Sequence, residues 1–294
     1  MKLRAPAKIN WALEALGRRR DGYHEIRTVL QTVDLCDSVT MEDAPALTLE
    51  LAGETGSLGE EDPRRNLAWR AVERLLERTG AGRGAHIRID KRIPVAGGLG
   101  GGSSDAAAAL RGANRLWRLD QPLDALLEVA STVGSDVPFF LVGGAALASG
   151  RGDVVRSLGD GPACDLLLAW PGAPSPPGKT ARLYGALTAA LFTDGAVTAE
   201  VARRVEAGET PPDESIVNVF EGVMEAVLPE TDRAMRALAR EGLRAHLCGA
   251  GPSLFVVLGG GDLAEARRLL ERQGWRAVVA RTLGRHAAAE VSGA

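Results

Sequence analysis

Residues 93–110, IPVAGGLGGGSSDAAAAL, hold five glycines between positions 97 and 102, followed by serines, an aspartate and a run of alanines. Glycine loses more conformational freedom on folding than any other residue, so this density indicates a place where a ligand or another backbone comes very close. Residues 85–93 alternate and predict a strand, and the alanine-rich stretch predicts a helix that begins at Ser103 or Ser104. A strand, a glycine loop and a helix in this order are typical of a phosphate site, where free N–H groups and the helix dipole meet an anion.

Two well-known phosphate loops do not fit the stretch. A Walker A loop needs lysine where this chain has Ser103, and a dinucleotide-binding loop that starts at Gly98 needs glycine at the same position. The residues therefore indicate either a third type of phosphate loop or a plain flexible linker.

Composition narrows the classes of protein. A length of 294 residues suits two domains, and 45% hydrophobic with 25% charged residues is typical of a soluble globular chain. A net charge of −3 and 4% aromatic residues argue against nucleic acid as the partner, and no apolar run is long enough for a membrane span or a signal peptide. We expect a cytoplasmic protein with a small-molecule partner. Three cysteines without C-x-x-C spacing predict neither disulfides nor a zinc site.

Patterns along the chain predict α/β organisation. The alternating segments around Asp21-Gly22 predict an N-terminal hairpin, and residues 66–80 and 123–134 have helical spacing. The turn-rich segment 149–163 suggests a boundary, which gives domains 1–155 and 156–294. In the second domain we expect a buried strand at 165–170, helices at 181–192, 219–228, 232–242 and 263–274, and a strand at 276–283. Residues 193–215 show no clear apolar period and are predicted to be mobile.

Five stretches of the chain carry a resemblance to a known family. The glycine-rich stretch resembles the ATP-binding signature of the superfamily of galactose, homoserine, mevalonate and phosphomevalonate kinases, and GAGPS at 249–253 is similar to its third motif. PAKIN at 6–10, DGYHEI at 21–26 and GSDVPFF at 134–140 are similar to the 4-diphosphocytidyl-2-C-methyl-D-erythritol kinases within it. The resemblance implies the two-domain α/β (α+β) kinase fold with the active site between the domains. It also implies ATP and Mg²⁺ as cofactors and phosphorylation of the 2-hydroxyl of the cytidylyl substrate in the non-mevalonate isoprenoid pathway.

The resemblance also assigns two catalytic residues. Asp136 alone reads as an N-cap for the next helix, but in GSDVPFF it matches the aspartate that takes the substrate's hydroxyl proton. Lys8 alone reads as an exposed edge-strand residue, yet it shares a strand face with Asn10 and is one of only four lysines among 35 basic residues. Beside Asp136, an ammonium group favours the ionised carboxylate and neutralises charge on the moving phosphoryl group.

The remaining site residues are expectations of the same kind. The ATP-binding set is Pro94, Gly97, Gly98, Leu99, Gly100, Gly101, Gly102, Ser103 and Ser104. The substrate-binding set is Asn10, Tyr23, His24, Tyr184, Gly249 and Gly251. The resemblance implies that Tyr23 and Tyr184 stack on cytosine while His24 hydrogen-bonds the edge of the base. Without the resemblance, Tyr23 and His24 would simply pack at a turn. GAGPS would likewise be only a hairpin turn. Ala250 stands where the family usually has serine, and spacing identifies no carboxylate as a metal ligand.

The sequence leaves two alternatives to this function open. A sister kinase for mevalonate, homoserine or a sugar would not need Tyr23 and His24 after the turn. A nucleotide-binding regulator without catalysis would not need Lys8 and Asp136 opposite the loop.

Overall fold

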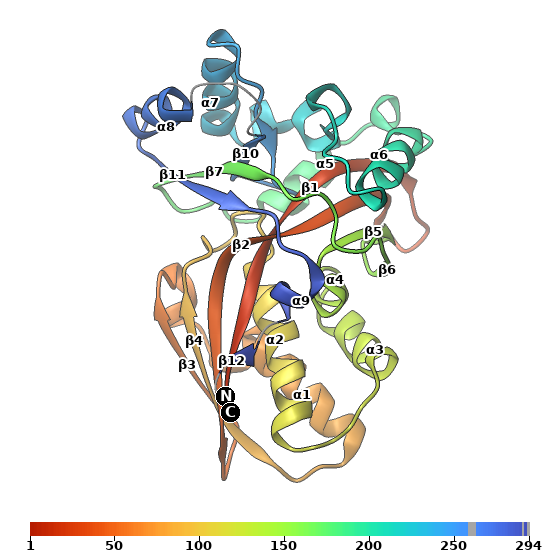
Figure 1. Cartoon of the computed structure of the whole chain (residues 1–294), viewed down its shortest axis with the longest axis vertical. Coiled ribbons are helices and arrows are strands. Elements are labelled where there is room, and N and C mark those ends of the chain that lie inside the picture. Colours follow the sequence, from red (N-terminus) through yellow and green to blue (C-terminus); the bar gives the residue numbers. More distant parts are fainter. Residues whose placement is uncertain (258–262, 290, 293–294) are drawn as a thin grey trace.

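The structure is a computed structural model that describes residues 1–257, 263–289 and 291–292. Its longest feature is the predicted N-terminal hairpin, in which β1 (Lys2–Arg18) pairs antiparallel with β2 (His24–Ala44). At the turn, Asp21 accepts a hydrogen bond from the N–H of Tyr23 at 3.1 Å. β1 is buried on both faces over most of its length, so its polar side chains lie inside the molecule. In Figure 1 both strands run from the lower end of the molecule into its upper half.

Two sheets organise the described residues. The larger sheet has the order β12-β1-β2-β4-β3, with β5 between β2 and β6 and with β8 parallel to β1. Its other strands are β3 (Thr48–Gly53), β4 (Gly84–Lys91), β5 (Ala145–Gly150), β6 (Val154–Ser157), β8 (Val217–Asn218) and β12 (Val291–Ser292). The smaller sheet has the order β11-β7-β10-β9 and consists of β7 (Asp165–Pro171), β9 (His246–Leu247), β10 (Leu254–Val257) and β11 (Trp275–Arg281).

Helices cover the larger sheet at the lower end of Figure 1. These helices are α1 (Leu67–Thr79), α2 (Gly101–Leu116), α3 (Leu123–Val133) and α4 (Val137–Val142). The alanines at 106–109 of α2 are fully buried and small, which lets α2 pack closely on its neighbours in one apolar cluster with β1, β2 and β4. The helix predicted at 66–80 is confirmed as α1, and Gly80, with φ +66°, is its C-cap.

The upper end in Figure 1 contains the smaller sheet and the later helices. They are α5 (Lys179–Ala186), α6 (Ala196–Glu206), α7 (Pro229–Arg240) and α8 (Leu263–Arg272), while α9 (Arg285–Ala288) returns toward β1 and β2. The boundary at residue 155 stays a prediction. β7 and β9–β11 follow that boundary and form the smaller sheet, whereas β8 and β12 rejoin the larger one.

Three local predictions for this half are wrong. Residues 193–215 contain α6, whose buried Thr198, Val201, Ala202 and Val205 have helical spacing within an otherwise polar segment. Residues 219–228 form the short 3₁₀ turns Val219–Gly222 and Met224–Ala226 instead of a helix, since Val223 with φ −131° interrupts them. The helix predicted at 181–192 starts at Lys179 and ends at Ala186.

Among the described residues, no helix combines the length and the apolar character that crossing a membrane requires.

Candidate active site

The glycine loop leads into α2 two residues earlier than predicted. Gly100, with φ +75°, is the N-cap, and neither Ser103 nor Ser104 caps the helix, so the prediction of a serine start is wrong. The first main-chain bond of α2 runs from Ser104 N to Gly100 O at 2.9 Å. The N–H groups of residues 101–103 therefore have no capping side chain, which leaves them available to an anion at this helix end.

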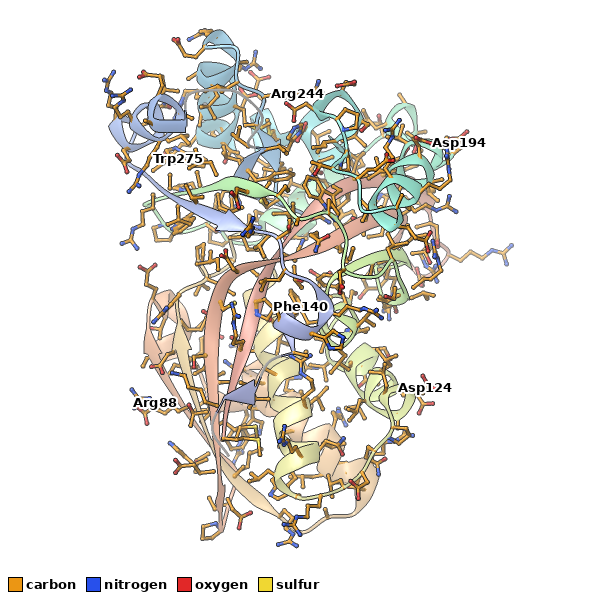
Figure 2. All side chains as sticks on the ribbon, viewed as in Figure 1. Arg88, Asp124, Phe140, Asp194, Arg244 and Trp275 are labelled. Atoms are coloured by element: carbon orange, nitrogen blue, oxygen red, sulfur yellow. The ribbon has the colours of Figure 1, made fainter. Side chains whose placement is uncertain are left out.

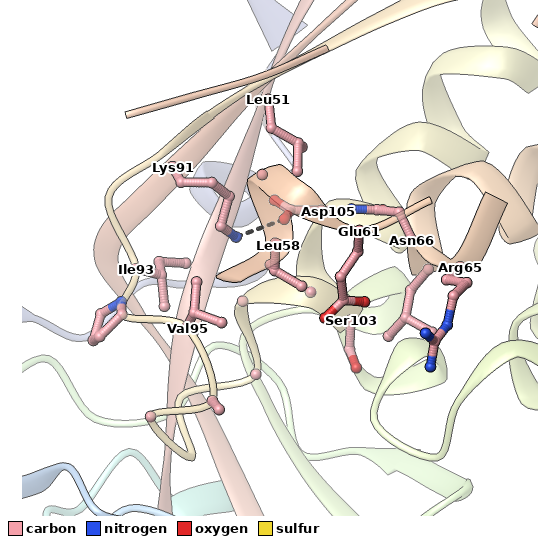
Figure 3. A pocket seen from close by; sticks show the side chains of 18 of the residues that line it. Leu51, Leu58, Glu61, Arg65, Asn66, Lys91, Ile93, Val95, Ser103 and Asp105 are labelled. Carbon is pink, nitrogen blue, oxygen red and sulfur yellow. Dashed lines mark hydrogen bonds and ion pairs between the residues drawn. The ribbon is translucent and has the colours of Figure 1, made fainter. Parts of the chain in front are cut away.

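Residues 101–103 line a cavity of about 430 Å³. One wall is the predicted loop, with Pro94, Gly97, Gly98, Gly100, Gly101, Gly102 and Ser103. The other wall comes from β3 and the segment before α1, and its apolar side chains include Leu51 and Leu58. Figure 3 shows Ile93 and Val95 on one side of this cavity and Asn66 on the other. An apolar slot beside free amides suits a nucleotide, because the slot takes the base and the amides take the phosphates.

A buried charge cluster forms the floor of this smaller cavity. The Lys91 ammonium group donates to Asp37 and, at 2.6 Å, to Asp105. Burial raises the pKa of Asp105 to about 7, with Lys91 opposing the rise and Asp37 adding to it. Asp105 Oδ1 is buried and has no partner among the described residues. The cluster fixes the start of α2 to β2 and β4 and leaves one carboxyl oxygen near the phosphate loop.

The same loop forms one wall of a larger cavity of about 1180 Å³. Ala96, Gly98 and Gly100 line both cavities, so the loop lies between them. The larger cavity is lined by four cationic side chains and one carboxylate, namely Lys8, Arg18, Arg151, Lys179 and Asp136. This excess of positive charge suits an anionic ligand.

Lys8 and Asn10 lie together on β1 in this cavity, as their shared strand face predicted. Lys8 is 4% exposed, so it is not a solvated edge residue. Its Nζ donates to Asn10 Oδ1 at 2.7 Å, and Asn10 Nδ2 donates to Thr28 Oγ1 at 2.8 Å. The backbone N–H of Lys8 bonds to Leu99 O at 2.9 Å, which joins β1 to the glycine loop. The ammonium group is thereby fixed beside the loop.

Asp136 lines the same cavity from the start of α4. It occupies the N-cap position, but its side chain makes no capping hydrogen bond. Phe140 of α4 packs against the loop: a Cβ at Gly100 would be 2.7 Å from its ring and 3.2 Å from Lys8 Cγ. Figure 2 shows Phe140 near the middle of the molecule. Glycine at position 100 therefore lets three parts pack together: the glycine loop, Lys8 and α4, which begins after Asp136.

The GAGPS segment is a turn between β9 and β10 that contacts the glycine loop. A Cβ at Gly249 would be 2.7 Å from Lys8 Nζ and 3.0 Å from Gly98 O, so this glycine permits the contact. Gly249 and Ala250 line the larger cavity. Gly251 instead packs toward Leu247 and Leu228 and lines neither cavity; Leu99 and Ser104 also lie behind the cavity walls.

The two rings predicted to stack on cytosine, Tyr23 and Tyr184, have different surroundings. Tyr184 stacks directly on His24 with centroids 5.1 Å apart, while Tyr23 is 56% exposed and has the Arg151 guanidinium 5.1 Å from its ring centre. His24 Nε2 is buried and has no partner among the described residues. Burial, together with the charge of Arg18, lowers the pKa of His24 and so favours the neutral ring. Its free nitrogen suits hydrogen bonding to a ligand.

Sequence reasoning missed four parts of these cavities. Arg18, Arg151 and Lys179 line the larger cavity, and residues 49–67 supply a wall of the smaller one. The scarcity of lysine was a usable signal for Lys179. Residues 49–67 carry no motif, because an apolar wall is recognised only once the chain has folded around it.

A phosphate-type loop between two cavities, with a lysine and a carboxylate lining the larger one, is the arrangement expected of a small-molecule kinase. Residues 66–144 match the model of the GHMP kinases N terminal domain. The crystal structures of homoserine kinase from Cytophaga hutchinsonii (TM-score 0.74, 19% identity, 97% of this chain and 95% of that chain) and of Streptococcus pneumoniae phosphomevalonate kinase (0.67, 13%, 96% and 99%) share the fold.

Two more similar proteins narrow the class. The chain is 37% identical over 286 residues to the 4-diphosphocytidyl-2-C-methyl-D-erythritol kinase of Dehalococcoides mccartyi, which covers 97% of this chain and 99% of that one. It matches a crystal structure of 4-(cytidine 5'-diphospho)-2C-methyl-D-erythritol kinase with a TM-score of 0.77 and 33% identity over 97% of this chain and 100% of that one. The chain belongs to the 4-diphosphocytidyl-2-C-methyl-D-erythritol kinase family, which confirms the resemblance and the fold expected from its motifs.

Proposed function

We propose that the protein transfers the γ-phosphoryl group of ATP to the 2-hydroxyl of 4-diphosphocytidyl-2-C-methyl-D-erythritol, a step of the non-mevalonate isoprenoid pathway. The observation that carries this proposal is the glycine loop as a common wall of the two cavities. ATP occupies the smaller cavity, with its phosphates at the amides of residues 101–103. The alcohol occupies the larger one, where Lys8 and Asp136 lie.

Asp136 acts as the general base in this scheme. Its carboxylate takes the proton of the 2-hydroxyl while the hydroxyl oxygen forms a bond to the γ-phosphorus and the bond to the bridging oxygen of ADP breaks. The absence of a capping hydrogen bond leaves the carboxylate free for this proton. Lys8, held by Asn10 and by the loop, provides positive charge next to the transferring group.

The residues of the smaller cavity fit ATP with Mg²⁺. No group of three or more His, Cys, Asp or Glu side chains within the described residues is arranged for a metal ion. Mg²⁺ commonly takes only one or two protein ligands besides phosphate oxygens and water. The Ser103 hydroxyl and the unpartnered Asp105 Oδ1 are the groups that would hold it. When bound, Mg²⁺ supplies neutralisation of phosphate charge.

The larger cavity provides chemistry for each part of the cytidylyl substrate. The cationic side chains suit its diphosphate, Tyr23 offers an exposed ring for stacking, and His24 offers an unpaired ring nitrogen to the base edge. Tyr184 supports His24 by stacking on it, so we assign Tyr184 to positioning of the imidazole. The pair Tyr23 and His24 argues against a sister kinase, because mevalonate and homoserine have no nucleobase to recognise.

Three free cysteines suit a reducing compartment, in line with a place in the cytoplasm.

Replacement of His24 by alanine tests recognition of the base. Loss of a hydrogen-bond partner for a buried polar edge costs about 1–3 kcal/mol, so we expect the affinity for CDP to fall by roughly 5- to 150-fold. ATP affinity stays the same, since His24 does not line the smaller cavity. Both affinities are measured by calorimetry, with His86→Ala, a half-buried histidine on β4 that lines neither cavity, as the control. Unchanged binding of CDP by the His24 variant would contradict a cytidine-reading role.

A further inference from the structure

Lys179 is a buried cation that the proposed mechanism does not use. It is the first residue of α5, it is 6% exposed, and it lines the larger cavity. Its Nζ donates to the carbonyl oxygen of Ala250 at 3.2 Å. Within the described residues no carboxylate forms an ion pair with Lys179. A buried charge without a counter-charge is costly, so its retention needs an explanation.

A second ammonium group lies close to it. A Cβ at Gly249 would be 2.7 Å from Lys8 Nζ, and Lys179 Nζ donates to the carbonyl of the next residue of the same turn, Ala250. Burial and, to a lesser extent, the charge of Lys8 lower the pKa of Lys179 to about 8. The other titratable or charged groups of this cavity are Arg18, Tyr23, His24, Asp136, Arg151 and Tyr184. Asp136 is the only carboxylate among the described lining residues, so the positive charge at the 249–250 turn is not balanced by the protein.

A ligand with several negative charges would balance the positive charge at the 249–250 turn. Phosphate oxygens are the chemical match for two neighbouring ammonium groups, since each accepts charge-assisted hydrogen bonds from Lys. Two phosphate sources reach this place in the proposed reaction. One is the diphosphate of the alcohol substrate in the larger cavity, and the other is the phosphoryl group that arrives across the loop.

We propose that Lys179 is a second phosphate-binding residue of the active site, whose ammonium group acts beside that of Lys8 on phosphate oxygens of the bound reactants. This inference rests on the proposed function. In the free protein the Ala250 carbonyl holds the ammonium group at the turn, and on binding a phosphate oxygen becomes its partner. Because Ala250 has no side-chain hydroxyl, Lys179 is also the side chain that brings a hydrogen-bond donor to this part of the turn.

The proposal predicts how the affinity for phosphate changes with pH. Only the protonated ammonium group binds an anion strongly, so the affinity for phosphate is fully present only well below pH 8. It falls as pH rises through the free-protein pKa of about 8, and the bound anion raises that pKa in the complex.

The test uses the variants Lys179→Met, which keeps length without charge, and Lys179→Arg, which keeps charge. Arg182→Gln, an exposed cation on the same helix, is the matched control. CDP binding is measured by calorimetry without ATP between pH 6.5 and 9.5, and kcat and KM are measured by ADP release. We expect Lys179→Met to bind CDP roughly ten- to a hundredfold more weakly at pH 7 and to lose the decline in affinity above pH 8. Lys179→Arg recovers most of the affinity, and Arg182→Gln behaves as the parent.

The outcomes separate the two phosphate sources and the two proposals. Weaker CDP binding assigns Lys179 to the substrate's diphosphate, whereas normal CDP binding with a tenfold or larger loss of kcat assigns it to the transferred phosphoryl group. A Met variant with parental melting temperature, CDP affinity and kcat overturns the role of Lys179. Equal losses in the Met and Arg variants with an unchanged pH profile overturn it too, since they indicate packing alone. If Lys179→Met does not fold, Lys179→Gln takes its place. Failure of the parent itself to bind CDP contradicts the proposed function instead.

Discussion

Replacement of Asp136 by asparagine is expected to lower kcat by about 10²–10⁴-fold, the usual contribution of a general base. The change keeps the size of the side chain and removes its ability to take the hydroxyl proton. The fold is expected to keep its melting temperature, because Asp136 makes no capping hydrogen bond that the variant would lose. ATP affinity also stays the same, since Asp136 lines only the larger cavity.

The measurement is a steady-state assay of ADP release together with a thermal melt. Asp124→Asn, an exposed aspartate in the first turn of α3, is the matched control and is expected to behave as the parent. Turnover of Asp136→Asn within a few-fold of the parent would show that Asp136 is a helix-start residue without a catalytic role.

The second large effect is expected for Gly101→Val. A Cβ at this position would be 3.0 Å from Ile93 Cγ2 and 3.2 Å from Lys91 Nζ, so the valine side chain is forced toward the N-terminus of α2 and the smaller cavity. A valine here would therefore narrow the smaller cavity at the start of α2, where the proposed phosphate site lies. Because hydrogen bonds to a charged group contribute about 1.5–3 kcal/mol each, loss of one or two lowers ATP affinity on the order of 10²-fold.

Calorimetry with ATP measures this effect, and a thermal melt shows whether the tight contact with Ile93 also affects stability. Gly82→Val is the control, since a Cβ at this exposed glycine meets no atom within 4 Å. A stable Gly101→Val protein with parental ATP affinity would mean that the loop is a linker between β4 and α2.

Local patterns predicted the parts of the fold that depend on local interactions. The hairpin of β1 and β2, the helix that ends at Gly80 and the glycine loop follow from alternation, capping and glycine density. The start of α2 was misplaced because a serine is the usual cap, whereas here Gly100 adopts φ +75° and leaves the amides open. α6 was missed because one half-buried face among many charges gives a weak signal.

The site residues also divide into those that local patterns predicted and those that only tertiary packing determined. Motifs identified Lys8, Asp136 and the loop, which the fold places around one wall between two cavities. No pattern in the chain indicated that Tyr184 would stack on His24, or that α5 would bring Lys179 to the turn at Ala250. These contacts join segments more than 70 residues apart, so tertiary packing alone determines them.

The most direct test of phosphoryl transfer across the glycine loop is ADP release from ATP with a panel of alcohols, followed by ³¹P NMR of the product. With 4-diphosphocytidyl-2-C-methyl-D-erythritol we expect rapid ADP release and one new phosphomonoester at carbon 2, with the diphosphate intact. Mevalonate, homoserine and sugars are expected to release no ADP above the rate with ATP alone. Equal turnover of mevalonate or homoserine, or ADP release that yields only inorganic phosphate, would contradict the proposed reaction.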